Sequence, residues 1–149
     1  MRELKGSGPD PETITAYIKQ TYPEAVVLEM TGTWFFSLDE KHWPNFATIV
    51  TTDEHDQASN LSRPGVFRLN IGVDRPTFQR VAESAPAPDY TALDRLLPHP
   101  VYAQQLWISI LNPSSRTFDE TVVPLLGLAH DRLANVPRRR ARKQATVRQ

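Results

Sequence analysis

The chain has 149 residues with 17 basic and 17 acidic side chains, so its formal net charge is zero. This length suits one domain that buries a core without disulfides or metals. The absence of cysteine excludes thiol catalysis, thiolate metal sites and disulfide bonds. The first residues lack the apolar stretch of a secretory signal, and no later run is long enough to span a bilayer. We therefore expect a cytoplasmic protein that does not associate with membranes.

The first third of the chain predicts one helix and three strands. Asp10 is a capping residue followed by a proline and an acid, which predicts a helix that ends before Pro23. The β-rich runs 26–30 and 34–38 flank a Thr-Gly-Thr turn and predict a hairpin. A third strand is expected over residues 46–51. A long loop over residues 53–64 follows it.

The segment 66–73 is the most strongly alternating part of the chain. Its apolar residues share one face of a strand and predict burial against a core: Phe67, Leu69, Ile71 and Val73. Arg68, Asn70 and Gly72 share the opposite face. Alternation alone leaves open whether this second face lines a groove or meets water.

The second half predicts two further helices, one short helix and one strand. Asp74 caps a second helix, residues 90–97 are expected to form a short helix, and residues 107–111 a strand. The final helix runs to about Asn135 and begins at the capping box Thr117–Glu120, while Pro124 indicates either a kink or a start one turn later. Short turns link the strands, so we expect an α+β domain with an antiparallel sheet of about five strands flanked by helices.

Several segments together resemble a known family. These are FATIVT at 46–51, SRPGVFRLNIGV at 62–73, LDRLLPHPVY at 93–102 and LNPS at 111–114. Over roughly residues 12–134 the chain resembles an uncharacterised bacterial family, domain of unknown function 6194, which brings no known activity with it. In the order of its elements the chain is also similar to the MmcQ/YjbR group, which implies a CyaY-like, helix-flanked antiparallel sheet. That group tends to carry basic residues and a histidine where this chain has Gln104, Gln105 and Leu106, which weakens a DNA-binding interpretation.

Charge is unevenly distributed along the chain. After Val136 there is no acid, and the basic residues there are Arg138, Arg139, Arg140, Arg142, Lys143 and Arg148. Removing these six leaves 11 basic against 17 acidic side chains in the rest of the chain. We expect a single domain over residues 1–135 and a basic, disordered tail over 136–149. The tail is the candidate nucleic-acid-binding element, because phosphate binding requires clustered cations.

Candidate ligand-binding residues cluster in two places. His99 lies between Pro98 and Pro100 and close to Tyr102, which suits either a rigidly held functional imidazole or a loop histidine bonded to a carbonyl. Donors are also present at Arg63, Arg68 and Asn70. These could hold an anionic or amide-bearing ligand, or an arginine could pair with a nearby acid. Between them these five residues form the hypothetical binding site.

The remaining patterns argue against known catalytic classes. Residues 53–56, Asp-Glu-His-Asp, have metal-like side chains, but they are consecutive on a loop without distant partners, so a solvated acidic loop is expected and no metal or cofactor. No nucleophile elbow, P-loop or dinucleotide fingerprint is present. We expect a non-catalytic binding or interaction domain of unknown ligand. The alternatives are nucleic-acid binding through the tail, and an enzyme with a pocket around His99, Arg68 and Asn70.

Overall fold

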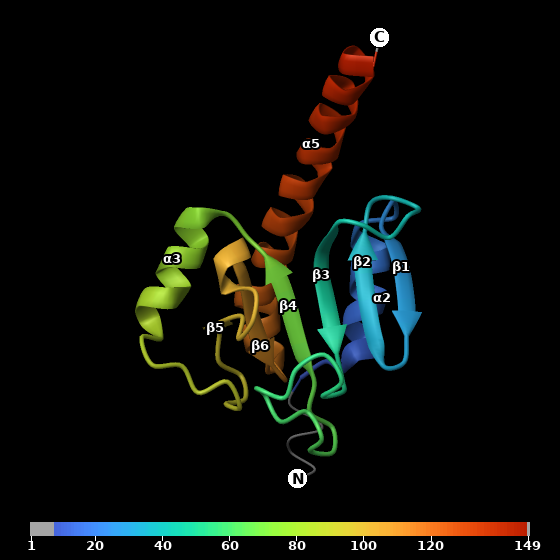
Figure 1. Ribbon diagram of the computed structural model, residues 1–149. Helices are drawn as coiled ribbons and strands as arrows, with labels where there is room; N and C mark the ends of the chain where they lie inside the picture. The colour runs from blue at the N-terminus through green and yellow to red at the C-terminus, as the bar shows by residue number, and fades with distance from the viewer. Residues whose placement is uncertain (1–7, 149) are drawn as a thin grey trace.

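The computed structural model describes the backbone of residues 8–148 and the side chains of residues 8–135. It contains one antiparallel sheet of six strands in the order β1-β2-β3-β4-β6-β5 (Figure 1). The strands are β1 (Val26–Met30), β2 (Thr33–Ser37), β3 (Asn45–Val50), β4 (Arg68–Gly72), β5 (Leu97–Pro98) and β6 (Trp107–Leu111). The helical segments are α2 (Pro11–Thr21), α3 (Arg75–Ser84), the 3₁₀ turn η1 (Ala103–Gln105), α4 (Ser115–Thr117), the π-helical turn η2 (Phe118–Val122) and α5 (Val123–Arg148). The predicted α+β class is confirmed.

The hydrophobic core lies on one face of the sheet, beneath α2 and α5. Figure 1 shows both helices behind the strands, with the opposite face turned toward the viewer. The strands contribute buried side chains from alternate positions: Phe36, Ala47, Ile49, Leu69, Ile71, Ile108 and Ile110. The helices contribute Ile14, Ile18, Val122, Leu126 and Ala129. Each fully buried aliphatic or aromatic side chain of this kind stabilises the fold by roughly 1.5–3 kcal/mol.

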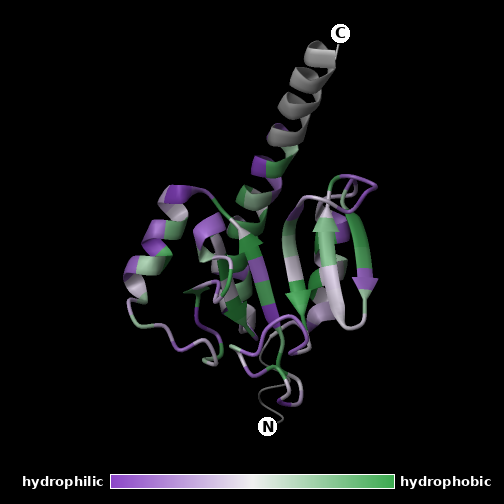
Figure 2. Ribbon diagram, in the orientation of Figure 1, coloured by the Kyte–Doolittle hydropathy of each residue, from purple (hydrophilic) through white to green (hydrophobic). Residues whose placement is uncertain are grey.

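Strands β4 and β2 divide their side chains between the two faces of the sheet. Along β4 the purple bands of polar residues interrupt the green of the apolar ones (Figure 2). In β2, Trp34 and Phe36 pack into the core, whereas Phe35 lies on the opposite face. The aromatic run 34–36 is therefore split by the sheet, as expected from the period of two.

Two sequence-based predictions about elements are wrong. Residues 90–97 do not form a helix: the segment is a loop that ends in β5, which pairs antiparallel with β6. Pro98 is tolerated there because β5 is an edge strand. The final helix does not begin at Thr117 either, because Ser114 is its cap and accepts the Thr117 N–H over 3.1 Å. The wide turn η2 ends at Val122, two residues before Pro124, which has no N–H to donate into a regular helical turn.

The helix caps at the other two helices are as predicted. Asp10 accepts the Thr13 N–H over 2.8 Å at the start of α2, and Asp74 accepts the Thr77 N–H over 3.0 Å at the start of α3. Such caps satisfy N–H groups that have no partner inside the helix.

The final helix also ends later than predicted, because the backbone of α5 continues to Arg148 and not only to about Asn135. The side chains of the basic tail lie outside the described residues, so its disorder and its binding role stay predictions. In the part of the chain that the structure describes, no helix is both long enough and apolar enough to cross a bilayer.

Candidate functional site

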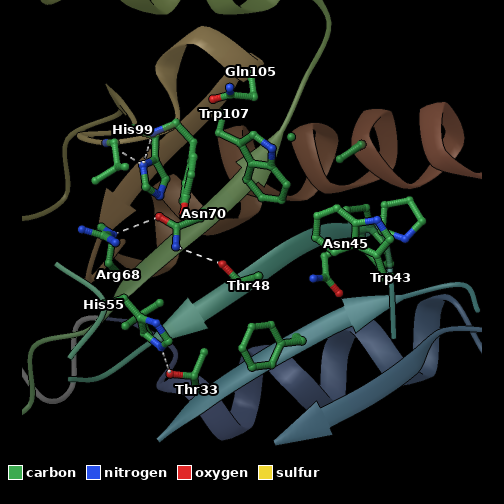
Figure 3. Close-up of a pocket in the computed structure, with 18 of the residues that line it drawn as sticks. Thr33, Trp43, Asn45, Thr48, His55, Arg68, Asn70, His99, Gln105 and Trp107 are labelled. Atoms are coloured by element: carbon green, nitrogen blue, oxygen red, sulfur yellow. Dashed lines mark hydrogen bonds between the residues drawn. The ribbon is translucent and has the colours of Figure 1, made fainter. Parts of the chain in front are cut away.

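A pocket of about 760 Å³ lies on the face of the sheet opposite the helices and reaches α5 at one end. Its volume is within the range of small-molecule sites. Its floor consists of alternate residues from the central strands: Thr33 and Phe35 of β2, Thr48 of β3, Arg68, Asn70 and Gly72 of β4, and Trp107 of β6. Two connections form its walls, the loop after β3 and the segment from His99 to Gln105 between β5 and β6 (Figure 3). The polar face of β4 therefore meets a concavity.

A chain of hydrogen bonds crosses the floor of the pocket. Arg68 Nε donates to Asn70 Oδ1 over 3.0 Å, and Ser109 Oγ donates to the same oxygen over 2.8 Å. Asn70 Nδ2 donates to Thr48 Oγ1 over 3.0 Å. Arg68, Asn70 and Ser109 are each 2% exposed. Because buried polar groups are costly unless paired, these side chains stabilise one another and form a polar framework inside the floor.

Arg68 also anchors the loop that follows β3. Its Nη1 and Nη2 lie 3.0 and 2.8 Å from the two carboxylate oxygens of Asp56, and Nη1 donates to Ser59 Oγ over 3.0 Å. The Arg68 and Asp56 side chains are only 2% and 15% exposed. The hydrogen bonds from Arg68 hold the pKa of Asp56 below its usual value, and they outweigh the opposing effect of burial. Arg68 thus forms the ion pair with an acid that was the alternative to ligand binding, and this pair is buried and bidentate.

The acidic run 53–56 is only partly the solvated loop that the sequence predicts. Asp56 turns inward to Arg68, and Asp53 accepts the Leu61 N–H over 2.8 Å. His55 also faces the pocket, with its Nε2 3.2 Å from Thr33 Oγ1. Within the described residues, no group of three His, Asp or Glu side chains is placed to hold a metal ion.

His99 is held rigidly over the floor. Its Nδ1 accepts the backbone N–H groups of Val101 and Tyr102, each over 2.9 Å. The alternative for His99, a ring that donates a hydrogen bond to a carbonyl, is therefore not what the structure shows. Nδ1 instead accepts hydrogen bonds from two backbone N–H groups. Figure 3 shows the ring between its own loop and the strand that carries Arg68 and Asn70. His99 is 4% exposed.

The same surroundings determine the charge of His99. Burial, together with the positive charge of Arg68, lowers the pKa of His99 to about 4, and the negative charge of Asp56 opposes this only in part. The imidazole is therefore neutral near pH 7. An acid–base group for neutral pH needs a pKa close to 7, so His99 is poorly suited to that role.

The structure brings four of the five candidate residues together. Arg68, Asn70, His99 and Tyr102 line the one pocket, and the rings of His99 and Tyr102 have centroids 5.0 Å apart. Arg63 lies elsewhere. Its guanidinium donates to the backbone carbonyls of residues 59, 60 and 91, over 2.9–3.0 Å, and so ties two loops together.

The mouth of the pocket carries large exposed apolar side chains. Trp43 is 71% exposed and Tyr102 54%. Gly72 allows the Trp107 ring to lie close to β4, because a Cβ atom on residue 72 would be 3.2 Å from the indole Cε2. Arg132 of α5 also lines the pocket and is exposed.

Sequence reasoning missed Asp56, Thr48, Ser109 and both pocket tryptophans. One signal was present, since Ser109 is the single polar residue inside the apolar strand β6. Asp56 had no local signal, because its partner lies beyond a long loop. The tail residues from Arg138 to Lys143 have side chains outside the described residues.

Fold and site together define an α+β domain with a pocket on the open face of its sheet. The chain belongs to the Family of unknown function (DUF6194), whose model matches residues 9–145. The family resemblance inferred from the sequence is thus confirmed. No curated protein and no solved structure matches the chain. The similarity to the MmcQ/YjbR group stays a prediction.

Proposed function

We propose that this domain binds a small molecule in the pocket on the open face of its sheet and performs no chemistry on it. One observation carries the proposal. The pocket of about 760 Å³ contains His99, a buried ring that two backbone N–H groups hold in place while its Nε2 has no hydrogen-bond partner among the described residues. A fixed polar group inside a largely apolar cavity is the usual arrangement of a small-molecule site.

Binding is favoured over the enzyme alternative because the polar residues near His99 are already engaged. Arg68 and Asn70 use their hydrogen-bonding groups on Asp56, Ser59, Ser109, Thr48 and each other. The charge of Arg68 is paired with Asp56, and Asn70 is uncharged, so neither side chain offers a free charge to a reaction. The low pKa of His99 also makes it a weak base at neutral pH.

A fluorescent probe tests the proposal directly. We expect 8-anilinonaphthalene-1-sulfonate to bind the full chain at one saturable site with enhanced emission, because aromatic rings line the pocket. Tyr102→Ala should weaken this binding several-fold. Met30→Ala is the matched control, because Met30 is also 54% exposed but does not line the pocket. Absence of saturable binding, or equal effects of both variants, would contradict the proposal.

Nucleic-acid binding through the tail remains the alternative function. The argument for it is the run of arginine and lysine after residue 137 without a compensating acid. Such binding would be independent of nucleotide sequence and would weaken steeply with salt.

A further inference from the structure

The hydrogen bonds of His99 determine which of its nitrogens carries the proton. The inference drawn from this proton rests on the small-molecule site proposed above. Nδ1 accepts N–H groups from both Val101 and Tyr102 over 2.9 Å, so it cannot carry a hydrogen of its own. A neutral imidazole has one protonated nitrogen, and here that nitrogen must be Nε2. His99 therefore presents a hydrogen-bond donor, and no acceptor, to the pocket.

This donor is unsatisfied within the protein. Among the described residues no group accepts a hydrogen bond from Nε2, although His99 is 4% exposed. The nearby acceptors are already in use: Asn70 Oδ1 accepts two hydrogen bonds, and Arg68 contacts both oxygens of Asp56. Nε2 is not among the described side-chain atoms that are both shut off from solvent and unpaired, so it can be reached from the pocket. A ligand with an acceptor at this point would form a hydrogen bond with Nε2 in place of water.

The charged groups that line the pocket disfavour a cationic ligand. Asp56 is the acidic side chain that lines the pocket, and Arg68 neutralises it. Arg132 adds an exposed positive charge at the mouth. Among the described lining residues, Asn45 Oδ1 is a buried oxygen without a partner, but it is shielded from solvent and lies beside Trp43 at the other end of the pocket (Figure 3). A ligand cation would thus meet no free carboxylate among the described lining residues.

The apolar surface of the pocket is mainly aromatic. Aromatic rings line the pocket at separate places: Phe35 of β2 and Trp107 of β6 on the floor, and Tyr102 at the mouth. Flat molecules pack well against aromatic rings. We infer that the pocket takes a planar aromatic or heteroaromatic molecule without positive charge, oriented so that a carbonyl oxygen or ring nitrogen accepts the Nε2–H of His99.

Two fused-ring probes of similar size separate the acceptor requirement from general aromatic binding. Quinoline offers a ring nitrogen acceptor and no N–H, whereas indole offers an N–H and no acceptor lone pair. We expect quinoline to bind the full ¹⁵N-labelled chain about tenfold more tightly than indole, which corresponds to about 1.4 kcal/mol. Dissociation constants follow from the amide shifts of Val101 and Tyr102. The imidazole ¹⁵N spectrum reports the tautomer of His99 in the same sample.

A conservative variant tests whether His99 causes the preference. His99→Asn keeps an oxygen that can accept the N–H groups of Val101 and Tyr102 as an Asx turn. Its amide N–H groups lie on a shorter side chain and do not reach the position of the Nε2 donor. The variant should fold, bind both probes, and lose the preference for quinoline. His42→Asn is the control, because residue 42 lies outside the pocket and has φ of 63°, a conformation that asparagine tolerates. It should keep the tenfold preference.

Each other outcome has a definite meaning. Equal affinities in the original chain, tighter binding of indole, or a protonated Nδ1 would overturn the acceptor inference and leave the small-molecule site standing. A preference that persists in His99→Asn would also overturn it. If neither quinoline nor indole shifts any amide of the pocket while 8-anilinonaphthalene-1-sulfonate still binds, the inferred ligand class is wrong. If no probe binds, the proposed function itself fails.

Discussion

Replacing Arg68 with methionine should destabilise the domain by about 3–5 kcal/mol, the usual cost of breaking a buried ion pair. Methionine keeps much of the side-chain volume but loses the hydrogen bonds to Asn70, Ser59 and both oxygens of Asp56. The Asp56 carboxylate, 15% exposed, is left without its partner. Because Asp56 lies on a loop that can turn toward water, we expect a value near 3 kcal/mol, a large part of the ~5–15 kcal/mol that typically stabilises a domain.

Urea unfolding followed by tryptophan fluorescence measures this loss, and the melting temperature should fall by about 9 °C at ~3 °C per kcal/mol. The double variant Asp56→Leu with Arg68→Met is the control. It removes both charges, so it should recover much of the lost stability. A loss below about 1 kcal/mol for Arg68→Met alone, as expected of an exposed pair, would refute the argument from burial.

The remaining predictions concern His99, Gly72 and the C-terminal segment. The folded protein holds the pKa of His99 near 4 instead of 6.5, so the unfolded chain takes up a proton first as the pH falls. Stability should therefore drop by up to about 3 kcal/mol between pH 6.5 and 4 and then receive no further contribution from His99. The free energy of unfolding, measured across this range, should depend on pH in the original chain and lose this dependence in His99→Asn. Equal pH dependence in the two proteins would contradict the burial of a neutral ring. Gly72→Val should cost about 1–3 kcal/mol in thermal unfolding by crowding the Trp107 ring, and no loss would mean that the indole moves aside freely. Truncation after Asn135 should leave the melting temperature nearly unchanged and abolish any salt-sensitive nucleic-acid binding, whereas a fall of many degrees would show that the segment packs on the domain.

The sequence alone determined most of the local elements and the division of side chains between the faces of β4. The period of two in β4 correctly placed Arg68, Asn70 and Gly72 on one side, because successive side chains in a strand must alternate. Asp10 and Asp74 marked two helix starts because a cap interacts with residues only three positions away. The capping box at Thr117 predicted the wrong start for the final helix, since Ser114 caps the helix one turn earlier.

Only the tertiary structure decided what the polar face of β4 meets. Local pattern carries no information about a partner beyond a long loop, so Asp56 appeared solvated although it pairs with Arg68. Likewise the prolines beside His99 indicated a rigid loop. They did not indicate that backbone N–H groups of this loop would donate to Nδ1, so that Nε2 remains without a partner among the described residues. The Arg68–Asp56 pair and the position of His99 beside β4 join separate segments of the chain, and they form only when the fold brings these segments together.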